Sequence, residues 1–301
     1  MEGLSYPLRL SAIGGSRRRP SYQYSPPFVS RDAGGVTAAS KVAAAIGVRG
    51  PSFCRGRGGP ASRGCSMAEG GGAEAPCGLT ELSDESDFDA LLSFDGYISI
   101  CGFGSLLSEK SARSTFPELR NFRVAQLRGF RRVFAHTAPT GEISSLSVEP
   151  CEGEILVVTV FEIYKTEIPS FIEREHEFRF LAVVPEEPNG SPFVRSAVLC
   201  ARYSDDEYLR VRCKGSQEIY FQRYGRHNIH KIWRDDILPC RVYLRHCVLA
   251  AKNLGQEAYD NFLDHTFIAD RETSIRQYLS STGSGIMQEE PPEALRSRYG
   301  G

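Results

Sequence analysis

The sequence predicts a mixed α+β domain, and three observations lead to this prediction. Many short runs of β-branched, aromatic and other apolar residues occur between residues 97 and 203. Helical patterns are few, and the clearest ones follow residue 239. The spacing of the runs is too irregular for repeated βαβ units. We therefore expect a small mixed β-barrel, closed or nearly closed, with α-helices packed against its outside.

The first expected element is a buried strand at Tyr97–Cys101, which Gly102 and Gly104 end in a tight turn. Ser108 predicts the N-cap of a short helix over residues 109–116. Further runs rich in β-branched and aromatic residues predict strands at 124–127, 132–136, 144–148, 155–163, 178–184 and 194–203.

Four helical segments complete the pattern. A short helix is expected at residues 167–177, between two of the strands. Residues 239–253 show the clearest helical pattern, because one apolar stripe runs along them and Gly255 stands just past their end. Two more helices are expected at 257–265 and 272–279.

Composition divides the chain into segments. Residues 1–66 contain ten Lys or Arg and two acidic residues, so they carry a net charge of +8 and leave −9 on the rest of a chain whose total is −1. Residues 67–95 are Gly-rich and then acidic, which predicts a linker. Residues 96–280 are expected to form the domain and residues 281–301 a flexible tail. The acidic domain disfavours nucleic-acid binding, which needs a positive surface.

The first 66 residues are rich in Ser, Ala, Gly and Arg and contain no apolar run long enough for a secretory signal or a bilayer span. This composition is typical of an organelle transit peptide, which predicts a chloroplast location or, alternatively, a mitochondrial one. The other interpretation is a disordered extension, with translation starting at Met67 and a cytoplasmic product. No membrane association is expected.

The cysteines and histidines give no sign of a metal site. Nine cysteines are scattered without a pair at metal-ligand spacing, and Cys101 and Cys200 lie in apolar runs, so reduced thiols are expected. His227 and His230 have the spacing of two ligands, but no nearby Cys, Asp or Glu completes a set.

The first candidate for a functional role is the loop formed by Phe103, Gly104, Ser105 and Leu106, between a predicted strand and a predicted helix. Glycine lets the backbone approach a ligand closely, and successive amide groups at such a turn can bind a carboxylate or an oxyanion. A turn that contains glycines more often has a structural role than a binding role. The loop therefore indicates a functional site only together with a second candidate residue.

The second candidate is a cluster of carboxylates, Glu173, Glu175 and Glu177, which alternates with Arg174 and His176 just before an apolar strand. On a helix, Glu173 and Glu177 share a face and Glu175 points nearly opposite, so one carboxylate is expected to turn inward. A buried carboxylate can act as a general acid or base near neutral pH. The alternative is a charged, solvated helix face.

Taken together, these two features resemble the γ-glutamylcyclotransferase-like family, which includes the glutathione-specific ChaC-type enzymes. The resemblance covers about residues 96–280. It rests on the order of a strand, the loop Phe103–Leu106, several further strands, and then Arg174-Glu175 before another strand.

The resemblance implies that backbone amides of the loop bind a γ-glutamyl group and that Glu175 transfers protons, although Glu173 or Glu177 is close enough to take its place. The family pattern has Tyr where this chain has Phe103, so only backbone contacts are expected there. In the implied reaction the α-amine of the substrate attacks its own γ-carbonyl, which gives 5-oxoproline and releases an amine, amino acid or peptide. No metal or other cofactor is needed.

Two alternatives stay open. The chain is a γ-glutamylcyclotransferase for a γ-glutamyl amine or modified metabolite instead of glutathione, or it is an inactive domain of the same fold that binds a small molecule or a partner protein. The enzyme hypothesis requires Glu175 and the Phe103–Leu106 loop to face the same cavity.

Overall fold

The computed structural model describes residues 79–137, 143–293, 296 and 299. The predicted transit peptide, residues 1–66, lies outside the described residues, as does the first part of the predicted linker.

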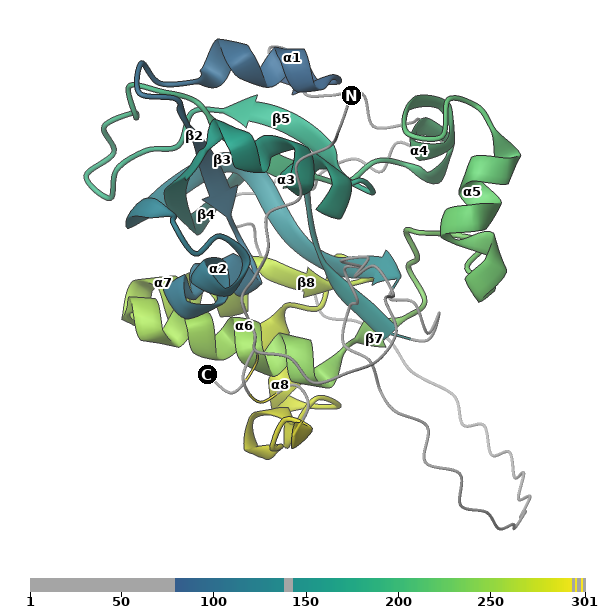
Figure 1. Ribbon diagram of the computed structural model, residues 1–301. Helices are drawn as coiled ribbons and strands as arrows, with labels where there is room; N and C mark the ends of the chain where they lie inside the picture. Colours follow the sequence, from purple (N-terminus) through teal and green to yellow (C-terminus); the bar gives the residue numbers. More distant parts are fainter. Residues whose placement is uncertain (1–78, 138–142, 294–295, 297–298, 300–301) are drawn as a thin grey trace, which may run out of the picture.

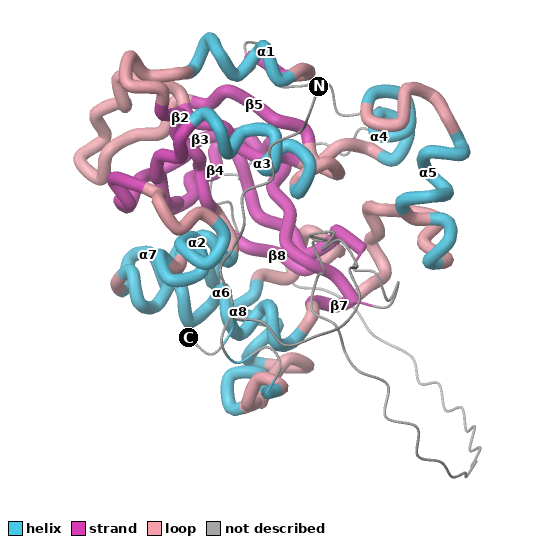
Figure 2. Tube along the Cα trace, in the orientation of Figure 1, coloured by secondary structure: helices cyan, strands magenta, loops and turns pink. Residues whose placement is uncertain are grey.

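One mixed sheet forms the centre of the described chain (Figures 1 and 2). The strand order is β1-β5-β6-β2-β4-β3-β8, and β7 pairs with β4. Three neighbouring pairs are parallel, namely β2 with β6, β3 with β8 and β4 with β7. The eight strands are β1 (Thr80–Leu82), β2 (Tyr97–Gly102), β3 (Arg120–Thr137), β4 (Ile143–Tyr164), β5 (Arg179–Val183), β6 (Ala197–Ala201), β7 (Leu238–Pro239) and β8 (Thr266–Ile268).

The helices lie around this sheet, with α6, α7 and α8 grouped on one side and α4 and α5 at a distance from them (Figure 2). None of the described helices has the length and apolar character that a bilayer crossing requires. The bounds are α1 (Glu85–Phe88), α2 (Glu109–Thr115), α3 (Ile168–Arg174), α4 (Asp205–Val211), α5 (Gln217–Arg223), α6 (Arg241–Leu254), α7 (Gln256–Asp264) and α8 (Ile275–Ser280). The predicted helices that correspond to α2, α6, α7 and α8 are thereby confirmed.

The sheet is curled but is not a closed barrel, so the prediction of a barrel is wrong. One buried hydrophobic cluster consists of strand residues alone, including Leu127, Val158 and Leu199, which shows that strands cover this face of the sheet themselves. An isolated bridge between Gln126 and Glu186 links β3 to the segment after β5. The sheet stays open because β1 and β8, which end the strand order, do not pair with each other in the described residues.

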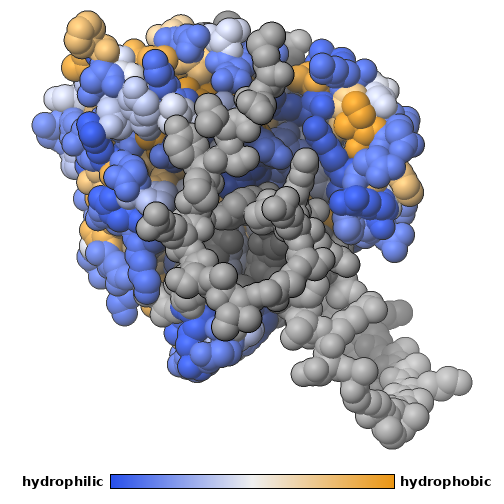
Figure 3. Space-filling model, viewed as in Figure 1, coloured by the Kyte–Doolittle hydropathy of each residue, from blue (hydrophilic) through white to orange (hydrophobic). Residues whose placement is uncertain are grey.

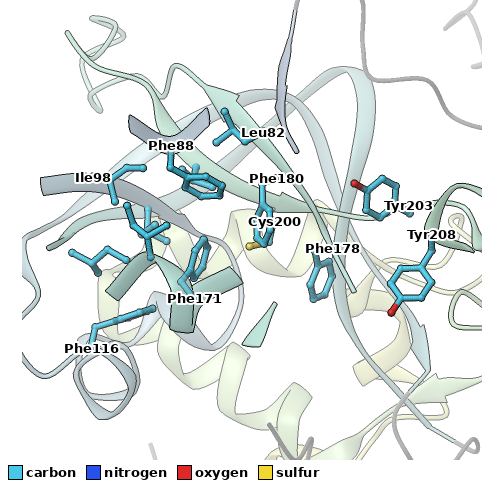
Figure 4. Close-up of a cluster of buried hydrophobic side chains, with 14 of the residues drawn as sticks. Leu82, Phe88, Ile98, Phe116, Phe171, Phe178, Phe180, Cys200, Tyr203 and Tyr208 are labelled. Carbon is cyan, nitrogen blue, oxygen red and sulfur yellow. The ribbon is translucent and has the colours of Figure 1, made fainter. Parts of the chain in front are cut away.

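The opposite face of the sheet packs against helices through aromatic side chains (Figure 4). The Phe180 ring of β5 lies 5.5 Å from the Phe88 ring of α1 and 5.4 Å from the Phe171 ring of α3, measured between ring centroids. Such aromatic contacts fix α3 against the sheet. The residue that follows α3 is Glu175, so this packing also positions the candidate carboxylate.

Two pairs of predicted strands are each one long strand in the structure. β3 combines the segments predicted at 124–127 and 132–136, and β4 combines those at 144–148 and 155–163. Gly129 has a φ of 79° and lies in a register shift between Arg128 and Phe130. The glycine therefore marks a β-bulge inside a strand, whereas the sequence suggests a break between two strands.

The described ends of the predicted linker and tail belong to the fold. Residues 79–95 contain β1, which pairs with β5, and α1, whose Phe88 is 1 % exposed. In the predicted tail, Ile286 and Tyr299 are buried, and the Tyr299 ring lies 5.0 Å from the His246 ring of α6. Although the composition of these segments predicts a linker and a tail, each contains a few apolar residues, and burial of those residues is enough to pack the segment against the domain.

The surface visible in Figure 3 is mostly hydrophilic where residues are described, with scattered apolar residues.

Candidate active site

The Phe103–Leu106 loop joins β2 to α2 through a short 3-10 helix, Ser105–Leu107. The amide groups of Gly104, Ser105 and Leu106 donate no hydrogen bond to any described residue, as is usual at the start of a helical turn. A Cβ atom on Gly104 would lie 3.0 Å from the Tyr243 hydroxyl, so glycine lets the loop lie close to α6 without displacing Tyr243. Ser108 caps α2 by accepting a hydrogen bond from the Ser111 amide, as predicted.

Two buried side chains hold the loop from behind. Arg132 of β3 is completely buried, and its Nε donates to the Phe103 carbonyl at 2.8 Å. Thr159 of β4 donates to the Leu106 carbonyl at 2.9 Å. Burial lowers the pKa of Arg132 to about 9, so the side chain stays a cation at neutral pH. These bonds fix the Phe103 and Leu106 carbonyls of the loop.

Gly102→Ala is expected to lower the free energy of unfolding by about 1–3 kcal/mol, the usual cost of overpacking a core. A Cβ at this position would lie 2.7 Å from both the Leu106 Cβ and the Thr159 Oγ1, so the loop must shift. Urea denaturation of the variant and the wild type measures the difference. An unchanged free energy of unfolding would show that the loop moves without cost and is not fixed by these contacts.

Glu175 follows directly after α3, where its backbone leaves the helical conformation. Its carboxylate accepts a hydrogen bond from the Arg174 Nε at 2.9 Å, and its side chain is 15 % exposed. The Arg174 guanidinium also lies 4.7 Å from the centre of the Phe116 ring. Packing of α3 and the ion pair therefore restrict where the carboxylate can point.

Glu175 and the predicted loop line the same cavity, which encloses about 70 Å³. This volume is several times the ~10–15 Å³ that one water molecule requires, so a small polar group fits. Phe171, Phe178 and Cys200, labelled in Figure 4, form part of its apolar wall. The other described lining residues are Ile100, Cys101, Phe103, Gly104, Ser105, Leu106, Ser111, Thr115, Ser145, Leu146, Arg174 and Tyr243.

The three candidate carboxylates occupy different environments. Because α3 ends at Arg174, Glu173 and Glu177 do not share a helix face as expected from the sequence. Glu173 is exposed, Glu177 is 4 % exposed, and neither lines the cavity. Burial, and next the charge of Glu175, raise the pKa of Glu177 to about 8.

Sequence reasoning missed five polar side chains of the cavity, namely Ser111, Thr115, Ser145, Tyr243 and, as a lining residue, Arg174. Arg174 was predicted only as part of a motif. Ser145 lies within a predicted strand, and Tyr243 lies on the apolar stripe of the predicted helix at 239–253, where the sequence suggests a core residue. Neither position carries a local signal for a ligand.

Other candidate positions lie away from this cavity. No group of three metal-ligating side chains occurs in the ranges that the structure describes, and His227 and His230 do not line the cavity. A larger hollow of about 740 Å³ lies between β1, α1, β3 and β5, and none of the predicted site residues lines it. Five of the described cysteines, Cys101, Cys200, Cys213, Cys240 and Cys247, are free thiols.

Comparisons with known proteins give limited similarity. No family model and no curated protein matches the chain. A solved structure titled "Gamma-glutamyl cyclotransferase" is 17 % identical, with a TM-score of 0.31, and the match covers 48 % of this chain and 89 % of that one. An uncharacterized protein from Homo sapiens is 18 % identical, with a TM-score of 0.32 and coverages of 48 % and 90 %. A protein from Arabidopsis thaliana is 12 % identical, with a TM-score of 0.31 and coverages of 44 % and 91 %.

Similarity of this degree is not evidence of an activity. The chemistry must therefore be inferred from the cavity and the groups that line it.

Proposed function

We propose that the domain cyclises the γ-glutamyl group of a small substrate to 5-oxoproline and releases an amine, an amino acid or a peptide. The observation that carries this proposal is that one carboxylate, Glu175, and the residues of the Phe103–Leu106 loop line a single cavity. A reaction in which one group moves protons and fixed amides stabilise an oxyanion needs these two parts.

The charges in the cavity match the head of a γ-glutamyl compound. That head carries an ammonium and a carboxylate on one carbon, and the cavity contains a carboxylate, Glu175, beside a guanidinium, Arg174. Arg174 can bind the substrate carboxylate while Glu175 faces the ammonium. With about 70 Å³ available, we expect the cavity to take the head of the substrate and the leaving group to extend outside it.

The reaction steps balance with one carboxylate. Glu175 takes a proton from the ammonium, and the freed amine attacks the γ-carbonyl carbon, so that a C–N bond forms and the carbonyl oxygen becomes negative. The amides of Gly104 and Ser105 stabilise that oxygen. Glu175 then protonates the leaving nitrogen as its bond to carbon breaks, and it accepts the second proton of the new ring nitrogen. Transfer of that proton to the released amine or to water restores the Glu175 carboxylate. Because the attack is intramolecular, holding the substrate in a bent conformation removes much of the barrier.

The test is release of 5-oxoproline by the full chain from glutathione, γ-glutamylalanine and γ-glutamylbutylamide. We expect equal amounts of 5-oxoproline and free amine from at least one of them, measured by chromatography and mass spectrometry. Turnover of the butylamide alone would identify an enzyme for γ-glutamyl amines. Absence of turnover from all three, with the protein folded by circular dichroism, would contradict the enzyme proposal and favour a binding domain.

A further inference from the structure

A row of three buried polar side chains, Ser145, His136 and Glu177, begins at the cavity wall. Ser145 of β4 lines the cavity, and its Oγ lies 2.7 Å from the Nδ1 of His136 on β3. The Nε2 of His136 lies 3.7 Å from the Oε1 of Glu177. The side chains of His136 and Glu177 are 4 % and 5 % exposed. The imidazole is fixed in place by the Trp233 and Phe178 rings, whose centroids lie 4.8 Å and 5.2 Å from its own.

One side-chain atom of His136 and one of Glu177 lack hydrogen bonds within the described chain, and the Glu177 Oε2 lies 3.3 Å from the His176 Nδ1. Neither the His136 Nε2 nor the Glu177 Oε2 has a hydrogen-bond partner among the described residues. Unpaired buried polar atoms are costly, so a small rotation of the carboxyl group that brings it to the imidazole is favourable. The direction of that hydrogen bond then depends on where the protons are.

Both groups are uncharged at neutral pH. Burial, and next the charge of His176, lower the pKa of His136 to about 3, so its ring is neutral and carries one N–H. Glu177, with a pKa of about 8, is mostly protonated. Both signs of charge surround Glu177, and burial outweighs them. The titratable groups that face it are His136 of β3, Glu175 and Arg174 at the end of α3, His176, Cys200 of β6, Tyr208 of α4, and Arg223 and Tyr224 at the end of α5.

The Ser145 Oγ and the His136 Nδ1 share one hydrogen bond, whose direction depends on which ring nitrogen has the proton. The Glu177 Oε1 lies 3.7 Å from the His136 Nε2, beyond hydrogen-bond distance. A small rotation would let protonated Glu177 donate to the Nε2, which would place the ring proton on Nδ1 and direct it to the Ser145 Oγ. The Ser145 hydroxyl then does not donate to the ring, and in the structure it donates to the His136 carbonyl through a long hydrogen bond of 3.4 Å. A charged acceptor inside the cavity would offer this proton a stronger hydrogen bond.

We propose that Ser145 is a further substrate-binding residue, whose hydroxyl donates a hydrogen bond to the carboxylate of the γ-glutamyl head, and that Glu177 sets this polarity through His136. The inference rests on the proposed function, because it concerns the same cavity. When Glu177 loses its proton, its carboxylate accepts the ring proton on Nε2, and Nδ1 then accepts from Ser145. The hydroxyl is turned away from the substrate, and binding weakens.

The test is the pH dependence of KM for the substrate that is turned over, measured from pH 6.5 to 9 for the wild type, Ser145→Ala, Glu177→Gln and a control, Ser147→Ala. Ser147 is a buried hydroxyl on the same strand, bonded to the Val133 carbonyl and absent from the cavity lining. Titration of the substrate affects all four proteins equally. Differences between their KM profiles therefore report on Ser145, His136 and Glu177.

For the wild type and Ser147→Ala we expect KM to rise about 10-fold as pH increases past 8, which corresponds to one hydrogen bond to a charged group. Ser145→Ala should start about 10-fold higher at pH 6.5, with kcat little changed, and should lack this rise. Glu177→Gln, which cannot ionise, should keep the low KM throughout. Circular dichroism checks that each variant is folded.

Two results would overturn the inference while leaving the proposed reaction intact. One is a normal KM for Ser145→Ala at pH 6.5, and the other is a Glu177→Gln profile parallel to that of the wild type. If the wild type turns nothing over, calorimetric binding of γ-glutamylalanine to the same four proteins gives the same comparison. Absence of any binding would then overturn both the inference and the proposed function.

Discussion

Glu175→Gln is expected to lower kcat/KM for release of 5-oxoproline by about 10²–10⁴-fold, the usual contribution of a positioned acid–base group. Glutamine has nearly the same shape as glutamate and can still contact the Arg174 guanidinium through its amide oxygen. It cannot accept a proton from the substrate ammonium or deliver one to the leaving nitrogen. Initial rates at saturating and limiting substrate separate the loss in kcat from any change in KM.

The matched control for this variant is Glu173→Gln, two residues earlier in the chain. Glu173 is exposed and does not line the cavity, so its replacement should leave the rate within about two-fold of the wild type. Equal activity of Glu175→Gln and wild type would show that Glu175 is not the proton carrier. Loss of activity in Glu173→Gln instead would show that the exposed carboxylate is the one that acts.

Much of the loop and the candidate carboxylate is predictable from local sequence. An apolar run followed by Gly102 and Gly104, and a Ser108 that can cap a helix, is a pattern whose physics is local. Charged residues beside an apolar run likewise mark Glu175 as one of few candidates. That these two segments, about 70 residues apart, meet in one cavity depends on the pairing of β2 with β6 and on the packing of α3.

The rest of the site depends on contacts that no local pattern encodes. Arg132 lies in an Arg-rich strand segment, and only the register of β3 shows that it, and not a neighbouring arginine, is buried behind the loop. Ser145 gains its importance from His136 on the adjacent strand and from Glu177, which lies beyond the end of α3. These three residues come together only in the folded chain.

Helix α4 was not predicted, although the sequence contains a signal for its start. Ser204 and Glu207 form a capping box at the start of α4, and their spacing is the standard mark of a helix N-terminus.

The prediction of a closed barrel failed for a different reason. Strand number and composition do not determine whether the edge strands of a curled sheet meet, because closure requires strand tilt and stagger to agree over the whole sheet.

Glu177→Gln is expected to change how the free energy of unfolding depends on pH, by about 2–5 kcal/mol in total. In the folded wild type Glu177 ionises near pH 8, whereas its ordinary value is 4.5. Between these two pH values the folded chain holds a proton that the unfolded chain releases, so wild-type stability falls as pH rises, by at most about 1.4 kcal/mol per pH unit. Glutamine does not ionise, so the variant lacks this decrease.

Urea denaturation of both proteins at pH 5, 6, 7, 8 and 9 measures the effect. The variant is expected to gain stability relative to the wild type from pH 5 to 8, and the difference should then level off. A buried amide without a full set of partners lowers the stability of the variant by a constant amount, so the slope, and not the offset, is the evidence.

His136 has the opposite influence, because its lowered pKa makes wild-type stability rise with pH from about 3 to 6.5. Both proteins contain His136, so its effect cancels in the difference. Parallel stability curves for the two proteins would mean that Glu177 is ionised inside the fold. In that case the imidazole N–H would already point toward Glu177 at neutral pH, and Ser145 would donate to His136 and not to a ligand in the cavity.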